Sequence, residues 1–290
     1  MIRFHLAAIV AILLLPAAGL ADDKTVYRIG IPRSMFRDLP PALVAFAGQP
    51  FSDLVKDQTG LKAEIVQDPE AMTVAKAIDE GKLQLGVFQG HEFAWAQAKY
   101  PSLQPLVCLV YRPKEFQGII LVRSDSKASN LGDLKGSKLV LASTLKDHAR
   151  LFLHKSRVDD MGDAKFGSTA EATSVHEGIH KVQDKEADVT VADFADWSYF
   201  QKLYPGPSQT LKVLAKSAVF PPTVLAYKKG GLDEAILNKI REGFLTVHKS
   251  AKGARMMGLI RIDRFDPVPA DYEENLNACR KAYPKPSGDK

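Results

Sequence analysis

The stretches TLKVLAKS (210–217) and PTVLAYKK (222–229) decide the fold, because they predict two strands that carry the chain back to a unit it has already left. The earlier unit begins with the β-prone run VYRIGI (26–31), and a second unit begins with GIILVRS (118–124). The chain therefore runs through lobe one, lobe two and lobe one again. Two crossings between lobes predict a hinge with a cleft beside it.

Both units alternate apolar β-prone runs with helical patterns, which favours a parallel or mixed sheet with helices on both faces. Pro69 suits the first turn of one helix and Gly81 suits its end. We predict an α/β fold in which the crossings lie near 111–118 and 210–222. The predicted division is residues 22–112 and 218–290 for lobe 1 and residues 113–217 for lobe 2.

The N-terminus, MIRFHLAAIVAILLLPAAGLADD, predicts a secretory signal peptide over residues 1–21. Arg3 precedes an apolar run, and Gly19 and Ala21 occupy the −3 and −1 positions of a cut before Asp22. The apolar run is short for a membrane span, and no cysteine follows it to carry a lipid. We therefore expect an exported, soluble protein without a lipid anchor, most simply in a bacterial periplasm.

Charge and cysteine content narrow the function classes. The chain has 39 basic and 34 acidic residues, a formal net charge of +5, and its cations are scattered among carboxylates. A nucleic-acid partner is therefore not expected. Cys108 and Cys279 are the two cysteines, and they either form one disulfide in an oxidising compartment or remain buried thiols.

The stretch HEGIH (176–180) matches the HExxH pattern of zinc hydrolases, in which two histidines on one helix face hold zinc and the glutamate acts as a base. The pattern is short, and no Gly-x-x-His extension follows His180. A helix with a solvated or packed His180 is the simpler interpretation. A zinc hydrolase with Glu177 as its base remains an alternative.

Several segments, taken in order, resemble the phosphate, phosphite and phosphonate-binding proteins of ABC importers. The resemblance covers about Tyr27 to the helix near Ile240 and rests on their order and spacing. The segments are IPRSMFRDLPPAL (31–43), FSDLVKDQTGLKAEIV (51–66), EGKLQLGVFQGHEFAWA (80–96), SNLGDLKGSKLVLAS (129–143) and SVHEGIHKVQDKEADVTVAD (174–193).

This resemblance implies a periplasmic-binding-protein-like fold, with a mixed sheet flanked by helices in each lobe. It implies a binding protein and not an enzyme, which captures a small ligand, a phosphonate or phosphate-type oxyanion, in the interlobe cleft. Closure around the ligand would then be recognised by an ABC permease at the inner membrane. A sensor or a periplasmic enzyme is the alternative partner.

The ligand site of such a fold is expected in loops at the carboxyl ends of strands. The first loop contains Met35 and Phe36, and Phe36 either walls the cleft or joins the core. The second contains Gln89, Gly90 and His91. Gly90 permits close backbone approach, the next helix offers amide donors to an anion, and His91 is a ligand contact or an exposed cap residue.

The third loop departs from the family. Where relatives carry a Ser-Thr-Ser-Gly-like cluster that holds phosphonate oxygens, this chain has Lys146-Asp147-His148-Ala149. Ser143 and Thr144 lie just upstream, and they cap the helix or partly replace the lost hydroxyls. An aspartate at this place repels a phosphonate unless it is protonated or paired.

The fourth region contains His176 and, after the next strand, Asp193, with Asp196 close behind. The resemblance places His176 at the start of a helix that faces the cleft. It makes Asp193 a candidate partner for a ligand amine, whereas the alternative for Asp193 is a helix N-cap.

Three of these loops each contribute a histidine, namely His91, His148 and His176. Three imidazoles with Met35 or Asp147 would suit copper or zinc, so a periplasmic metal-binding or delivery protein is an alternative function. The first expectation is a protein without a cofactor, in which these histidines donate hydrogen bonds to an oxyanion.

Overall fold

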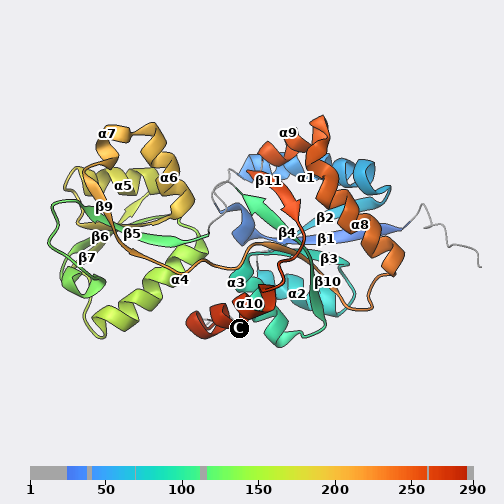
Figure 1. Ribbon diagram of the computed structural model, residues 1–290, viewed down its shortest axis with the longest axis horizontal. Helices are drawn as coiled ribbons and strands as arrows, with labels where there is room; N and C mark the ends of the chain where they lie inside the picture. The colour runs from blue at the N-terminus through green and yellow to red at the C-terminus, as the bar shows by residue number, and fades with distance from the viewer. Residues whose placement is uncertain (1–24, 38–40, 69, 112–115, 260, 286–290) are drawn as a thin grey trace, which may run out of the picture.

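The computed structural model describes residues 25–37, 41–68, 70–111, 116–259 and 261–285, so the predicted signal peptide lies outside the described residues. The described chain forms two lobes, each built on its own mixed sheet (Figure 1). This confirms the predicted two-lobed α/β fold. No helix in the described part of the chain is both long and apolar enough to cross a membrane.

Lobe 1 contains a six-stranded sheet of order β11-β4-β10-β3-β1-β2, in which β1 pairs in parallel with β2 and β3, and β10 runs antiparallel to its neighbours β3 and β4. Its strands are β1 (Val26–Pro32), β2 (Lys62–Asp68), β3 (Leu85–Phe88), β4 (Leu103–Tyr111), β10 (Val224–Lys228) and β11 (Ile262–Asp266). Its helices are η1 (Arg33–Phe36), α1 (Pro41–Thr59), α2 (Ala71–Asp79), α3 (Gly90–Lys99), α8 (Glu234–Thr246), η4 (Val247–Lys249), α9 (Ala251–Leu259) and α10 (Tyr272–Ala282).

Two apolar clusters fill the two faces of this sheet. One packs α1, α8 and α9 against the sheet through residues such as Leu54, Leu237 and Met257, and the other packs α2, α3 and α10 through Val74, Phe93 and Leu276 (Figure 1). Helices on both faces follow from strands that are apolar on both sides.

Lobe 2 contains a five-stranded sheet of order β7-β6-β8-β5-β9, with one continuous apolar core. Its strands are β5 (Gly118–Arg123), β6 (Lys138–Ala142), β7 (Ser168–Ala172), β8 (Val189–Asp193) and β9 (Leu211–Lys216). Its helices are η2 (Leu131–Leu134), α4 (Asp147–Ser156), the π-helical turn η3 (Arg157–Met161), α5 (Val175–Gln183), α6 (Phe194–Leu203) and α7 (Pro205–Ser208).

The chain crosses between the lobes after β4 and again between β9 and β10, as the sequence predicts. The two crossings are joined to each other, because the Gln117 side chain donates to the Ser217 carbonyl at 2.8 Å and the Gly118 amide donates to the Ser217 hydroxyl at 3.0 Å. Phe220 is buried beside this junction and stacks on Tyr283, which follows α10, with ring centroids 4.6 Å apart. The C-terminal segment therefore packs against the hinge.

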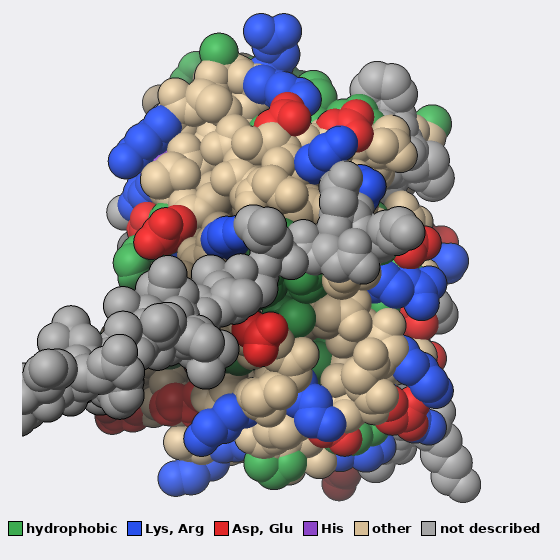
Figure 2. All heavy atoms as spheres, turned by 90° about the vertical axis from the view of Figure 1, so that its right-hand side faces the viewer, with side chains coloured by type: hydrophobic (Ala, Val, Ile, Leu, Met, Phe, Trp, Pro, Cys, Tyr) green, Lys and Arg blue, Asp and Glu red, His purple; other side chains and the backbone are tan. Residues whose placement is uncertain are grey.

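Two further features bear on the sequence analysis. Cys108 and Cys279 are both buried free thiols, so of the two alternatives the structure shows the unpaired one. Figure 2 shows Lys and Arg interspersed with Asp and Glu over the lobe 1 end of the molecule. The face in that view offers no broad surface of one sign for a polyanion.

Candidate functional site

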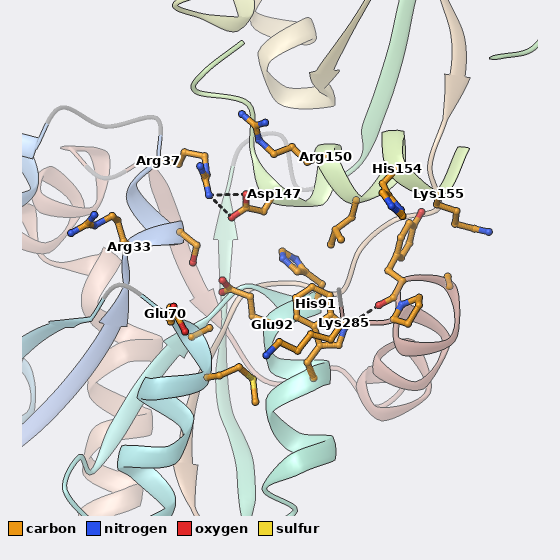
Figure 3. A pocket seen from close by; sticks show the side chains of 18 of the residues that line it. Arg33, Arg37, Glu70, His91, Glu92, Asp147, Arg150, His154, Lys155 and Lys285 are labelled. Atoms are coloured by element: carbon orange, nitrogen blue, oxygen red, sulfur yellow. Dashed lines mark hydrogen bonds and ion pairs between the residues drawn. The ribbon is translucent and has the colours of Figure 1, made fainter. Parts of the chain in front are cut away.

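A cleft of about 1600 Å³ lies between the lobes, and both lobes and the C-terminal segment line it (Figure 3). Lobe 1 contributes residues of η1 and of the start of α2 and one face of α3, and lobe 2 contributes one face of α4. Three predicted site residues line this cleft: Phe36, His91 and Asp147. Phe36 also packs against the core of lobe 1, so both of its proposed roles occur together.

An ion pair joins the lobes across the cleft. Arg37, which follows η1 in lobe 1, places one guanidinium nitrogen 2.9 Å and 3.1 Å from the two carboxylate oxygens of Asp147, the first residue of α4 in lobe 2. Both side chains are partly exposed, at 41% and 24%. The predicted repulsion between Asp147 and an anion is thus offset by a paired arginine, which sequence reasoning did not identify.

The neighbouring residue His148 points the other way, into lobe 2. Its Nε2 lies 2.6 Å from an Asp193 carboxylate oxygen, and both side chains are buried. The other Asp193 oxygen accepts from the Ala195 amide at 2.8 Å and lies 3.3 Å from Lys146 Nζ. Asp193 is therefore the N-cap of α6, with its carboxylate already surrounded by donors.

These contacts explain the state of Asp193. Burial by itself raises the pKa of this carboxyl, but the Lys146 ammonium, the His148 hydrogen bond and the Ala195 amide together hold the pKa below its usual range. Asp193 is thus ionised and paired within lobe 2.

His91 and Glu92 begin α3 on the opposite wall. His91 is buried with its ring against Trp95 and Phe220, and burial, together with His148, lowers the pKa of His91 to about 3. Glu92 accepts from the Gln89 amide at 3.0 Å, and burial raises the pKa of Glu92 to about 7 although this bond lowers it. At neutral pH His91 is therefore uncharged, and Glu92 holds its proton to a higher pH than an exposed glutamate does.

Gly90 serves a packing role in this structure. A Cβ at Gly90 would lie 2.0 Å from the Pro221 carbonyl oxygen, so the glycine lets the second crossing pass against the start of α3. The Gln89 side chain donates to the Ser34 carbonyl at 3.0 Å and ties this helix start to η1. The backbone that approaches Gly90 is therefore the protein's own.

The remaining predicted residues lie outside this cleft lining. Met35 packs against the core of lobe 1. The Ser143 hydroxyl donates to the Thr173 carbonyl at 3.1 Å, and Thr144 follows it, half-buried. The His176 ring contacts Tyr199, Phe200 and Tyr204 in lobe 2.

The three histidines are not brought together. His91 and His148 both contact Phe220, with ring centroids 6.1 Å and 5.4 Å away, whereas His176 lies among the aromatic rings of α6. Within the described ranges, no group of three or more His, Cys, Asp and Glu side chains is placed to hold a metal ion.

The HEGIH motif likewise has a local explanation. Glu177 accepts hydrogen bonds from the Thr173 amide and hydroxyl and pairs with Lys181 at 2.9 Å. His180 packs on Phe200 and Tyr204 and lies 3.2 Å from the Gln183 side chain. The motif therefore forms the start and one packed face of α5.

Sequence reasoning missed most of the cleft lining. Arg33 and Arg37 lie on either side of the two residues predicted from the first loop, so their positive charge could have identified them as anion partners. Trp95 donates to the Tyr283 carbonyl at 2.9 Å, a contact across 188 residues that no local pattern predicts. Other lining residues missed are Glu92, Arg150, Leu151, His154 and Val158.

Solved structures share this architecture. A Xanthomonas citri protein bound to ATP has a TM-score of 0.66 at 18% identity, covering 89% of this chain and 96% of that one. The protein PhnD1 of Prochlorococcus marinus in complex with methylphosphonate has a TM-score of 0.63 at 14% identity, covering 88% of this chain and 97% of that one. A binding protein component of an ABC phosphonate transporter from Pseudomonas aeruginosa has a TM-score of 0.59 at 17% identity, covering 89% and 85%.

No curated protein matches this chain in sequence. Residues 38–272 match the family described as the periplasmic substrate-binding protein of phosphonate ABC transporters. This match spans both lobes and both crossings, and it agrees with the fold of the solved structures. The chain therefore belongs to the family of phosphonate ABC transporter periplasmic substrate-binding proteins.

Proposed function

We propose that this protein is the exported substrate-binding component of an ABC importer, and that it captures a phosphonate-type oxyanion in the interlobe cleft. The observation that carries the proposal is the Arg37–Asp147 pair, in which an arginine of lobe 1 already holds an oxyanion supplied by lobe 2. Family membership and the methylphosphonate complex of the Prochlorococcus marinus protein support a phosphonate as that ligand.

Arg37 and Arg33 are the ligand's proposed anion partners. A guanidinium presents a planar set of donors that matches carboxylate, phosphate and phosphonate oxygens. Arg33 also lines the cleft and is exposed, and no carboxylate among the described residues pairs with it. Asp147 is paired with Arg37, and an incoming phosphonate competes with this carboxylate for the same donors.

Binding then couples to closure. The cleft walls come from both lobes, so a ligand that contacts both stabilises the closed arrangement by its differential affinity for that state. A permease at the inner membrane recognises the closed protein. We also propose that the chain is cleaved before Asp22, that it carries no lipid anchor, and that it acts in binding and not in catalysis.

The alternative functions receive less support. The family is one of transport proteins, which favours neither metal delivery nor a zinc hydrolase. His176 also lies away from His91 and His148, and Glu177 is engaged by Thr173 and Lys181. A cofactor-free binding protein therefore remains our proposal.

Titration calorimetry with methylphosphonate, inorganic phosphate and sulfate tests the proposed function. Methylphosphonate should bind. Arg37→Ala should lower the affinity for methylphosphonate by about ten- to hundredfold, because it removes a charged hydrogen-bond donor. Arg241→Ala in α8, outside the cleft lining, is the matched control and should leave affinity unchanged. Absence of binding by all three anions, or equal affinity in Arg37→Ala, would overturn the proposal.

A further inference from the structure

The cleft is longer than a small oxyanion requires. One face of α4 and the following turn lines it through Asp147, Leu151, His154 and Val158, which are spaced by four, three and four residues. At a helical rise of 1.5 Å per residue, this row extends for about 16 Å. The cleft volume of about 1600 Å³ also exceeds the range of roughly 300–1,000 Å³ that is usual for small-ligand pockets.

The chemistry of the walls changes along this length. Figure 3 shows Arg33, Arg37 and Asp147 toward one end, and His154 and Lys155 toward the other. Lys155 is paired with Asp159 at 2.5 Å, so its charge is already offset. Between these groups the lining is mixed, with His91, Glu92 and Arg150 as well as apolar side chains.

Three of the apolar side chains in the lining make up what we name the apolar wall: Trp95 from lobe 1, and Leu151 and Val158 from lobe 2. Trp95 is oriented by its hydrogen bond to the Tyr283 carbonyl, and it remains partly exposed. Leu151 is also partly exposed, and Val158 is 55% exposed. Apolar side chains from two lobes thus line the same cleft as the proposed anion partners.

We infer that the ligand is a phosphonate with a bulky apolar substituent, whose anionic group binds Arg33 and Arg37 and whose substituent covers the apolar wall. The inference rests on the proposed function, since it extends the same cleft. Covering exposed apolar surface is favourable in proportion to its area, and it requires contacts from both lobes, so the substituent also favours closure. Methylphosphonate would use only the charged end.

A paired calorimetric titration of the full-length mature protein with methylphosphonate and decylphosphonate, whose chain is long enough to extend along this row, tests the inference. Decylphosphonate should bind about tenfold more tightly, because its extended alkyl chain can cover the apolar wall as far as Val158. Val158→Asn should reduce this preference to about threefold or less and leave methylphosphonate affinity within about twofold. Val158 is exposed, so its replacement leaves the core intact.

The matched control is Val213→Asn in β9, which changes an exposed valine outside the cleft lining and should alter neither affinity. If both ligands bind with equal affinity, the apolar wall is not used and the inference fails while the proposed function stands. If the preference survives Val158→Asn unchanged, the substituent does not lie where we place it and the inference fails. If neither ligand binds, the proposed function and the inference fail together.

Discussion

Asp147 and His148 are consecutive residues at the start of α4, yet they belong to two different regions of the molecule. Asp147 faces the cleft and pairs with Arg37 of the other lobe, whereas His148 is buried and pairs with Asp193 of its own lobe. Two adjacent polar side chains leave a helix start about 100° apart, so one faces the cleft and the other faces the core. A single charged loop therefore serves both the site and the stability of lobe 2.

The surroundings of the two pairs set their energetic roles. A buried charge without its partner loses solvation that nothing replaces, so the Asp193 cluster should matter greatly for folding. A partly exposed ion pair is screened by water, so the Arg37–Asp147 pair should matter little for folding and can exchange partners. The comparison predicts that stability and binding will respond to different members of one loop.

The largest expected effect is the loss of Asp193. Asp193→Ala removes the partner of buried His148, the partner of Lys146 and the N-cap of α6, and it should lower the free energy of unfolding by about 3–5 kcal/mol. Urea unfolding measures this value. Asp196→Ala, a more exposed carboxylate 3.8 Å from Lys146, is the control and should cost less than about 1 kcal/mol. If Asp193→Ala lowers the free energy of unfolding by a similarly small amount, the buried cluster and the cleft pair do not differ in their contribution to stability.

Glu92 lies between the two extremes, because it lines the cleft as Asp147 does but is buried as Asp193 is. Burial raises its pKa from 4.5 to about 7, so the folded protein keeps this proton over a pH range in which the unfolded chain releases it. Stability should therefore fall as pH rises from 4.5 to 7, by at most about 3 kcal/mol, and level off above pH 7.

Urea unfolding at pH 5 and pH 8 checks this sign. The parent should lose stability between pH 5 and pH 8. Glu92→Gln should lose less over the same range, because its neutral side chain has no proton to release. Glu177→Gln is the control, since hydrogen bonds from Thr173 and Lys181 lower the pKa of Glu177 and its titration lies below this range. An equal pH dependence in Glu92→Gln and the parent would show that Glu92 is ionised throughout.

The smallest expected effect on stability is that of Asp147→Asn. The pair it breaks is partly exposed, so the free energy of unfolding should change by less than about 1 kcal/mol in urea. A loss comparable to that of Asp193→Ala would mean that the interlobe pair holds the lobes together, and it would contradict the division proposed for this loop.

The sequence predicted the lobes and crossings because these depend on local apolar patterns, as in GIILVRS and PTVLAYKK, which form β5 and β10. It also identified Asp147 as a departure from the family pattern. It did not predict that Asp147 pairs with Arg37, 110 residues away, or that Asp193 binds its neighbours in space. Such contacts depend on how the two lobes and their helices meet, which no local spacing records.

The helical spacing of His176 and His180 illustrates the same limit. It correctly places both side chains on one face of α5, where both contact Phe200. It does not reveal what faces them, and the aromatic side chains of α6 come from a different part of the chain. Spacing thus identified the shared face, and tertiary packing decided its role.

The most direct measurement is a double-mutant cycle on methylphosphonate affinity with Asp147→Asn and Arg37→Ala. If the phosphonate replaces Asp147 on Arg37, Asp147→Asn should raise affinity by about two- to fivefold in the protein that retains Arg37. In the Arg37→Ala background Asp147 has lost its partner and repels the anion, so the same substitution should raise affinity there as well. The double mutant should still bind more weakly than Asp147→Asn, because only the latter retains the arginine. A lower or unchanged affinity in Asp147→Asn, or a double mutant that binds as tightly as Asp147→Asn, would contradict competition between Asp147 and the ligand for Arg37.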